Sequence, residues 1–155
     1  MNDETRELLR KLLTGERVLS LAVVAEGEPV AGLLPFVPTA DFGALLVQAS
    51  RLARHSKGLR EGAPFSALIH APDAEDADPL QILRVTLGGK VEALPAEGPE
   101  AEEARVAYLA RFPTAGITLG LGDFGFYRLR IESGRLVAGF GRAFNLEASS
   151  LRELA

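Results

Sequence analysis

Residues 17–50 read RVLSLAVVAEGEPVAGLLPFVPTADFGALLVQAS, and this stretch decides the fold class. Apolar residues dominate three runs within it, 17–25, 29–37 and 44–49, and short segments rich in Gly, Pro, Glu and Asp separate the runs. Runs of this length and composition, bounded by turn residues, are typical of β-strands. The stretch therefore predicts a β-meander of three successive strands.

The flanking segments add further elements. Leucines at helical spacing predict a helix over Asp3–Leu13, and residues 64–71 predict a fourth strand before the acidic loop APDAEDADP. Next, ILRVTLGGKVEAL alternates apolar and polar residues, as a half-buried strand does, and its Gly88-Gly89 pair predicts a bulge. The acidic PEAEEARVAYLARF predicts a helix, and residues 125–144 predict a hairpin that turns at Glu132–Gly134.

These elements amount to six or seven strands with two or three helices and no βαβ alternation. This order favours a β-rich α+β fold, a small antiparallel barrel with flanking helices, over a doubly wound sheet. A length of 155 residues with 47% hydrophobic residues fits a single domain over 1–155, and we see no repeat or linker.

Charge and cysteine content exclude several classes of function. A net charge of -4 argues against general binding to nucleic acid or anionic membranes, which depends on Lys and Arg. The absence of Cys excludes disulfides, thiolate chemistry and Cys-based zinc sites. The charged, amphipathic N-terminus does not resemble a signal peptide, and no apolar run reaches the length of a membrane span. We expect a cytoplasmic protein.

The stretch QASRLARHSKGLREG concentrates cations in an otherwise acidic chain. We expect it to form a helix over Arg51–Glu61 with Ser50 as its N-cap. At 100° per residue, Arg51, Arg54 and His55 then share one face near the helix N-terminus, where a phosphate-sized anion is favoured. A solvated basic face is the alternative, and the residues alone leave both open.

Other motifs carry weaker signals. GLGDFG, residues 120–125, matches the dinucleotide-binding pattern but precedes a strand and lacks a βαβ unit, so we interpret it as a turn. His70 has no neighbours at metal-ligand spacing, and no hydrolase nucleophile stands out. Arg84 alternates out of the apolar face of its strand, where it either faces solvent or lies beside a cofactor ring. Arg142 stands in the closing GFGRAF.

The order of these parts resembles the pyridoxamine 5'-phosphate oxidase-like FMN-binding split barrels, and within them the haem-utilisation branch. Five stretches carry the resemblance over about residues 5–146, namely SRLARHSKGL, RVTLGGKVE, YLARFP, LGLGDFGFYRL and LVAGFGRAF. The resemblance implies a six- to seven-stranded split β-barrel that binds FMN as a homodimer, with cofactor sites at the subunit interface.

The resemblance also assigns roles. It implies that Ser50, Arg51, Arg54 and His55 hold the FMN phosphate, that Arg84 lies by the isoalloxazine ring, and that Arg142 approaches the ring or the partner. Lys57 and Arg60 are then ordinary surface charges.

The chain also departs from the family pattern. The second strand, PVAGLLPFV, lacks the cation of vitamin B6 oxidases, and no histidine follows Arg142 to bind haem iron as in haem-degrading members. We therefore expect an FMN-dependent oxidoreductase that acts on a small molecule. A haem-binding protein, a flavin-binding protein without turnover and a ligand-free dimerising module are the alternatives.

Overall fold

The computed structural model describes residues 1–155 and contains seven strands and four α-helices. The strands are β1 Val18–Ala25, β2 Glu28–Pro38, β3 Ala44–Ser50, β4 Pro64–His70, β5 Arg84–Ala93, β6 Phe124–Val137 and β7 Ala143–Glu147. The helices are α1 Asp3–Gly15, α2 Pro99–Arg111, α3 Gly116–Leu119 and α4 Ala148–Arg152, with the short 3-10 turns η1 Arg54–Gly58, η2 Pro79–Gln81 and η3 Pro113–Ala115.

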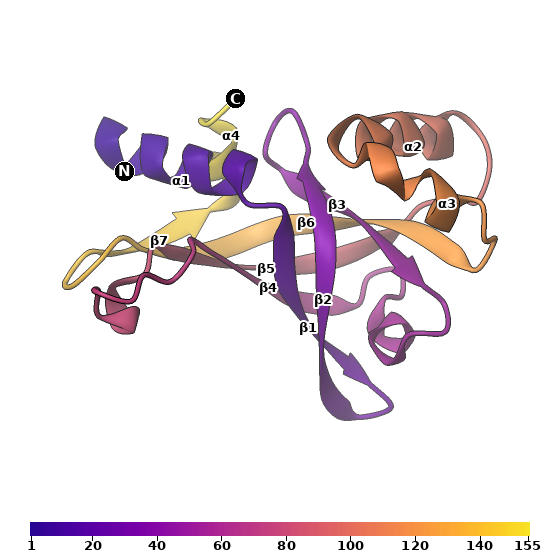
Figure 1. The fold of residues 1–155 in the computed structure, drawn as a ribbon, viewed down its shortest axis with the longest axis horizontal. Coiled ribbons are helices and arrows are strands. Elements are labelled where there is room, and N and C mark those ends of the chain that lie inside the picture. The colour runs from indigo at the N-terminus through magenta and orange to yellow at the C-terminus, as the bar shows by residue number, and fades with distance from the viewer.

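All strand pairs are antiparallel, in the order β3-β2-β1-β4-β5-β6-β7, and a further pairing of β3 with β6 closes six of them into a barrel. The long β6 makes this closure possible, since its first half pairs with β3 and its second half with β7. Figure 1 shows α1 and α4 at one side of the barrel, α2 and α3 at the other, and the β1–β2 hairpin projecting below. The predicted split barrel with flanking helices is confirmed.

Alternating burial along the strands explains the core. In β1 every second residue is buried, so Leu19, Leu21 and Val23 fill the barrel. In β3, by contrast, both faces are covered: Leu45 and Val47 point into the barrel, while Leu46 packs outside against α2 with Tyr108 and Phe112. Helix α2 therefore covers the outer face of β3.

The predicted bulge is present, because the β5–β6 register shifts between Gly88 and Gly89. A Cβ at Gly89 would lie 1.9 Å from the carbonyl oxygen of Arg130, so only glycine fits there. Bulges increase the local bend of a strand, which helps a small barrel to close.

The predicted hairpin turn at Glu132–Gly134 is wrong, because residues 124–137 form one continuous strand. Gly134 does not turn the chain. Its backbone lies so close to β5 that a Cβ would be 2.8 Å from Leu87 Cδ2 and 3.0 Å from the carbonyl oxygen of Thr86. The chain reverses five residues later, where Gly139 and Gly141 take positive φ angles of 105° and 71° before β7.

The predicted helix over Arg51–Glu61 is also wrong. Ser50 ends β3 instead of capping a helix, residues 51–53 form a turn, and only Arg54–Gly58 coil, as the 3-10 turn η1. Packing against the barrel fixes this geometry. A Cβ at Gly58 would lie 2.7 Å from the Val23 side chain, so the backbone of η1 rests directly on β1.

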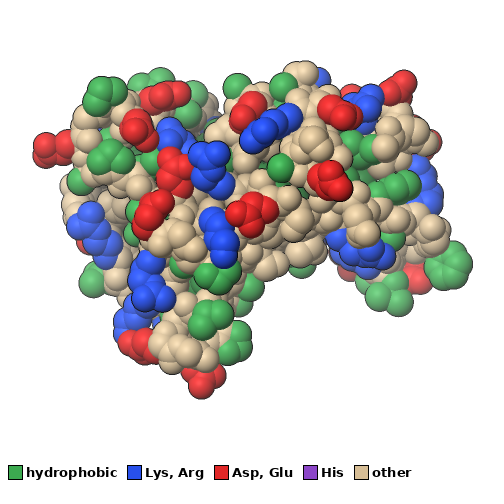
Figure 2. Space-filling view, turned by 180° about the vertical axis from the view of Figure 1, so that it is seen from behind, with side chains coloured by type: hydrophobic (Ala, Val, Ile, Leu, Met, Phe, Trp, Pro, Cys, Tyr) green, Lys and Arg blue, Asp and Glu red, His purple; other side chains and the backbone are tan.

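Arg111 ties α2 to α1. Its guanidinium donates to the carbonyl oxygens of Thr14 and Glu16 at the end of α1, and it lies over the rings of Phe36 and Phe112. Burial, together with the nearby Arg17, lowers the pKa of Arg111. No helix is long and apolar enough to cross a membrane. Figure 2 shows acidic and basic side chains interspersed over one face, without a broad field of one sign.

Candidate functional site

Two grooves lie side by side on the outer surface of the barrel, beneath α2 and α3, and share Phe124 as a wall. We name the first the Gln48 groove; it lies between η1 and α2 and has a volume of about 480 Å³. Leu33, Gln48, His55, Tyr108, Phe112 and Phe124 are among its lining residues. This size is within the range of small-molecule sites, about 300–1,000 Å³.

His55 enters the Gln48 groove from η1. Its ring lies on Gly32 of β2, where a Cβ would come within 2.5 Å of Nδ1, so the absent side chain is what makes room for the imidazole. Nε2 is buried and has no hydrogen-bond partner. Burial lowers the pKa of His55, so the neutral imidazole is favoured near neutral pH.

Gln48 is the buried polar residue of β3, with 5% of its surface exposed. It points outward, as Leu46 does, and pairs across the sheet with Phe126. Its Nε2 is buried without an acceptor, although buried amide groups in proteins are nearly always hydrogen-bonded. The sequence interpretation did not single out Gln48. One signal was available, since it is the only polar residue inside the run ALLVQA.

Ser50 plays a local role in this structure. Its hydroxyl donates to the Asp123 carboxylate at 3.2 Å and accepts from the backbone N–H of Leu52. Beside it, the N–H of Arg51 donates to the carbonyl oxygen of Asp123 at 2.7 Å. These bonds join the start of the basic stretch to the GLGDFG turn, and they direct the chain out of β3 into η1.

The three predicted phosphate ligands of the basic stretch diverge, because the helix that would align them does not form. Arg51 lines the second groove, Arg54 lies near Glu26 at the tip of the β1–β2 hairpin, and His55 enters the Gln48 groove. Neither arginine forms an ion pair. Lys57 does, donating to Glu26 at 2.8 Å, as expected of a surface charge.

We name the second groove the Arg51 groove. Besides Arg51 it is lined by Glu97, Glu102 and Arg105, together with Phe126 and apolar residues of the loop before α2. Arg105 also lacks an ion pair, and its charge and that of Arg51 balance the two carboxylates. This groove is therefore polar and mixed in charge, whereas the Gln48 groove contains no Lys or Arg.

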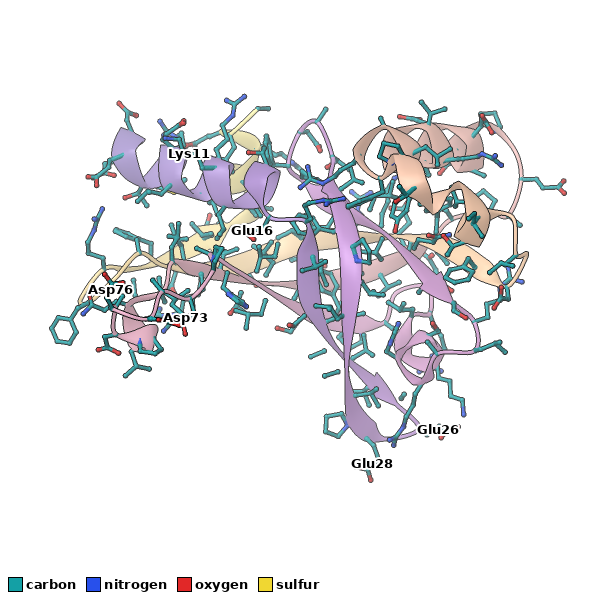
Figure 3. All side chains as sticks on the ribbon, viewed as in Figure 1. Lys11, Glu16, Glu26, Glu28, Asp73 and Asp76 are labelled. Atoms are coloured by element: carbon teal, nitrogen blue, oxygen red, sulfur yellow. The ribbon has the colours of Figure 1, made fainter.

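Arg84 and Arg142 lie at the other end of the molecule. Arg84 begins β5, while the backbone N–H of Ala93, the last residue of that strand, donates to the carboxylate of Glu61 at the end of the basic stretch. At about 3.3 Å per residue the two ends of this strand are roughly 30 Å apart. Figure 3 shows Glu26, at the tip of the β1–β2 hairpin, on the opposite side of the molecule from Asp73 and Asp76 of the acidic loop.

Both of these arginines have partners in the chain. Arg84 Nη1 donates to the carbonyl oxygens of Leu80 and Ile82, and Arg142 Nη2 pairs with Glu4 of α1 at 3.3 Å. Within one chain the structure therefore keeps Arg84 and Arg142 apart from the basic stretch, and within that stretch the side chains of Arg51, Arg54 and His55 diverge.

Other chemistry-bearing residues do not gather into a site. No group of three His, Asp or Glu residues could hold a metal ion. His70 is exposed at the end of β4, with Nδ1 2.7 Å from the carbonyl oxygen of Ala71. The acidic run Asp73–Asp78 is exposed, as predicted, and GLGDFG forms a turn that leads into β6.

Comparison with known proteins supports the fold on independent grounds. No family model and no curated protein matches the chain. A haem-binding protein from Mycobacterium smegmatis is 29% identical over 99% of this chain, with a TM-score of 0.82. A second solved structure is 32% identical over 97% of both chains, with a TM-score of 0.81. An FAD- and haem-binding protein from the same species, 23% identical over 92% of this chain and 81% of its own, shares the fold with a TM-score of 0.61.

The barrel closed by β3 and β6, with a groove at its outer wall, defines a split-barrel protein. The chain therefore has the split-barrel fold of the pyridoxamine 5'-phosphate oxidase-like proteins that its sequence resembles, and its neighbours among solved structures include haem-binding and FAD-binding proteins. The chain spans 62% of the length of the mycobacterial haem-binding protein.

Proposed function

We propose that the protein binds FMN non-covalently with the ring in the Gln48 groove, and that it is an FMN-dependent oxidoreductase acting on a small molecule. The observation that carries the proposal is the groove itself, where aromatic walls surround two buried nitrogens, Gln48 Nε2 and His55 Nε2, that lack partners in the protein. Such groups are costly when unsatisfied, and a bound heteroaromatic ring would satisfy them.

The aromatic walls suit a flat ring. Tyr108 and Phe112 are buried with their ring centroids 5.0 Å apart, and Tyr108 also meets Phe126 edge-on at 5.5 Å. Because these rings already brace one another, they present a rigid surface that loses little entropy when a planar ligand packs on it. Bound flavin would supply the electron-transfer chemistry, and the protein would bind and orient it.

The phosphate of FMN is assigned to the arginines of the basic stretch. Arg51 and Arg54 are exposed and carry no ion pair; Arg51 lines the neighbouring Arg51 groove and Arg54 lies on η1 near Glu26. The hydroxyl of Ser50 is engaged by Asp123, so it contributes less than the sequence resemblance implies. His55, held neutral by burial, serves as a hydrogen-bonding group toward the ligand and not as a charge.

A homodimer would bring the remaining predicted residues to the site. Arg84 and Arg142 lie at the end of the chain away from η1, so one copy cannot unite them with Arg51 and Arg54. A two-fold arrangement can place this end of one copy against the groove of the other. As part of the same proposal we place the protein in the cytoplasm, consistent with the absence of cysteine.

Fluorescence titration with FMN tests the assignment. Quenching of FMN should saturate at one molecule per chain, and the double variant Arg51→Ala/Arg54→Ala should weaken binding about ten- to a hundredfold through lost charged hydrogen bonds. Arg60→Ala is the matched control, because Arg60 is an exposed arginine of the same stretch. Equal affinities for the wild type and the double variant would refute the phosphate assignment.

Haem binding is the second candidate, favoured by the haem-binding protein that is 29% identical over nearly the whole chain. His55 is then the residue that fits an iron ligand, because it is neutral, unpartnered and in the groove. Addition of haem should produce a Soret band that shifts in His55→Ala and not in His70→Ala. If the Soret band shifts in His55→Ala and the wild type does not quench FMN fluorescence, haem and not FMN is the ligand.

A further inference from the structure

We propose that Gln48 recognises the imide edge of a bound flavin, the edge on which an N–H lies between two carbonyl groups. The inference rests on the proposed function and deepens it, since it names the part of the ligand that the groove selects.

The position of Gln48 makes it a recognition group. It is 5% exposed, it lines the groove, and its Nε2 finds no acceptor in the protein. At the preceding outward position, residue 46, the same strand carries a leucine that packs against α2. A leucine at 48 would therefore fill the space without leaving an unsatisfied amide, so the amide adds nothing to the packing of this wall.

The chemistry of a primary amide limits the kinds of ligand that Gln48 can recognise. Gln48 offers N–H donors on one atom and an acceptor on the other, and a 180° rotation of the amide exchanges them with little change of shape. An imide edge is the complement, because its carbonyl accepts from the amide N–H while its N–H donates to the amide oxygen. The same two-point pairing lets Gln recognise the donor and acceptor edge of a nucleobase.

The rest of the groove argues against a ligand whose polar end is an anion. None of its lining residues is Lys or Arg, and His55 is held neutral. Burying a carboxylate there would leave its charge unpaired, which is costly. The edge of haem offers hydrocarbon and two carboxylates but no N–H donor, so Gln48 suits a flavin better than it suits haem.

A ligand-by-variant cycle tests the proposal. FMN and N3-methyl-FMN, which lacks the imide N–H, are titrated into the wild type and Gln48→Leu. We expect the wild type to bind FMN about tenfold more tightly than its methylated analogue, and Gln48→Leu to bind both alike and more weakly than the wild type binds FMN. Thr118→Val is the control, since Thr118 lines the same groove but its hydroxyl already donates to the carbonyl oxygen of Ala115. This variant should prefer FMN over N3-methyl-FMN by the same factor as the wild type.

Each result decides the matter. Equal discrimination in the wild type and Gln48→Leu overturns the proposal, as does a wild type that binds both flavins alike, and in either case flavin binding itself stands. A wild type that binds neither flavin overturns the proposed function and this inference together. Gln48→Leu should unfold at a temperature no lower than the wild type without ligand; if it fails to fold, Gln48→Met replaces it, and the wild-type comparison of the two flavins holds regardless.

Discussion

Gly32→Ala tests whether the His55 ring is held in the Gln48 groove by its contact with the backbone of β2. The new Cβ would lie 2.5 Å from Nδ1, 2.9 Å from Cγ and 3.0 Å from Cε1 of His55. Because ordinary contact begins near 3.4 Å, the ring has to move by about 1 Å or leave the groove.

Two consequences follow for Gly32→Ala. Overpacking of this size typically costs about 1–3 kcal/mol in the free energy of unfolding. A ring that leaves the groove regains water, so the pKa of His55 should rise from its lowered value toward the ordinary 6.5. Affinity for FMN should fall as well, because the groove loses one of its two unpartnered nitrogens.

Proton NMR provides the assay, because the chain contains only two histidines and so only two Cε1 proton signals have to be followed. His70→Gln assigns the two signals. Gly88→Ala is the control, since a Cβ at this strand glycine would make only ordinary contacts, the nearest at 3.6 Å from the carbonyl oxygen of Phe65. If the pKa of His55 is the same in the wild type and in Gly32→Ala, the ring does not rest on β2 and our description of the groove is wrong.

Three further predictions concern stability. Gly89→Ala places a Cβ 1.9 Å from a backbone carbonyl oxygen, so urea unfolding should show a loss of about 3 kcal/mol or more, whereas a wild-type midpoint would contradict the bulge. Arg111→Ala removes a charged donor from the last carbonyls of α1, so thermal unfolding should show a loss of about 1.5–3 kcal/mol in the free energy of unfolding. The exposed Arg10→Ala is the control and should be as stable as the wild type. Equal losses in the two variants would show that Arg111 does not link α2 to α1. Stability should fall as the pH drops through 6.5, because the unfolded chain then binds a proton at His55 more readily than the folded chain does. His55→Gln should lose that part of the pH dependence in a series of melting curves, and an unchanged slope would show that the folded protein accepts the charge.

The strands were predictable because the pattern of apolar residues along the sequence indicates which segments are buried. In β5 apolar residues alternate with polar ones, and the structure buries the apolar set, including Val85 and Leu87, whereas β1 was predictable as an apolar run bounded by turn residues. The Gly88-Gly89 bulge was predictable for a similar reason, because paired glycines inside a strand pattern have few other uses.

The two errors arise where tertiary contacts override local signals. Ser-Gly at 133–134 is a common turn sequence, but Gly134 is needed for close approach to β5, a contact with a segment nearly fifty residues earlier that local sequence cannot reveal. The basic stretch has the composition of a helix, yet its attachment to Asp123 and to β1 limits it to a single 3-10 turn. A helical wheel applied there brings together side chains that the structure separates.

The candidate site was predictable only in part. The basic stretch pointed to η1 because its cations lie close together in the sequence, but the groove also needs Tyr108 and Phe112 from α2 and its end, and Phe124 from β6. Their meeting depends on the closure of β3 against β6, and so on topology. Gln48 could have been found as a polar residue in a buried strand, although its lack of a partner is visible only in three dimensions.

The position of the flavin is tested most directly by the Cε1 proton signals of the two histidines as FMN is added to the wild-type protein. A flavin ring in the Gln48 groove lies against His55, whereas His70, which is exposed at the end of β4, is not among the residues that line this groove. We predict that the His55 signal shifts saturably at one FMN per chain while the His70 signal stays in place. A shift of His70 alone, or of neither signal at saturating FMN, would contradict the account.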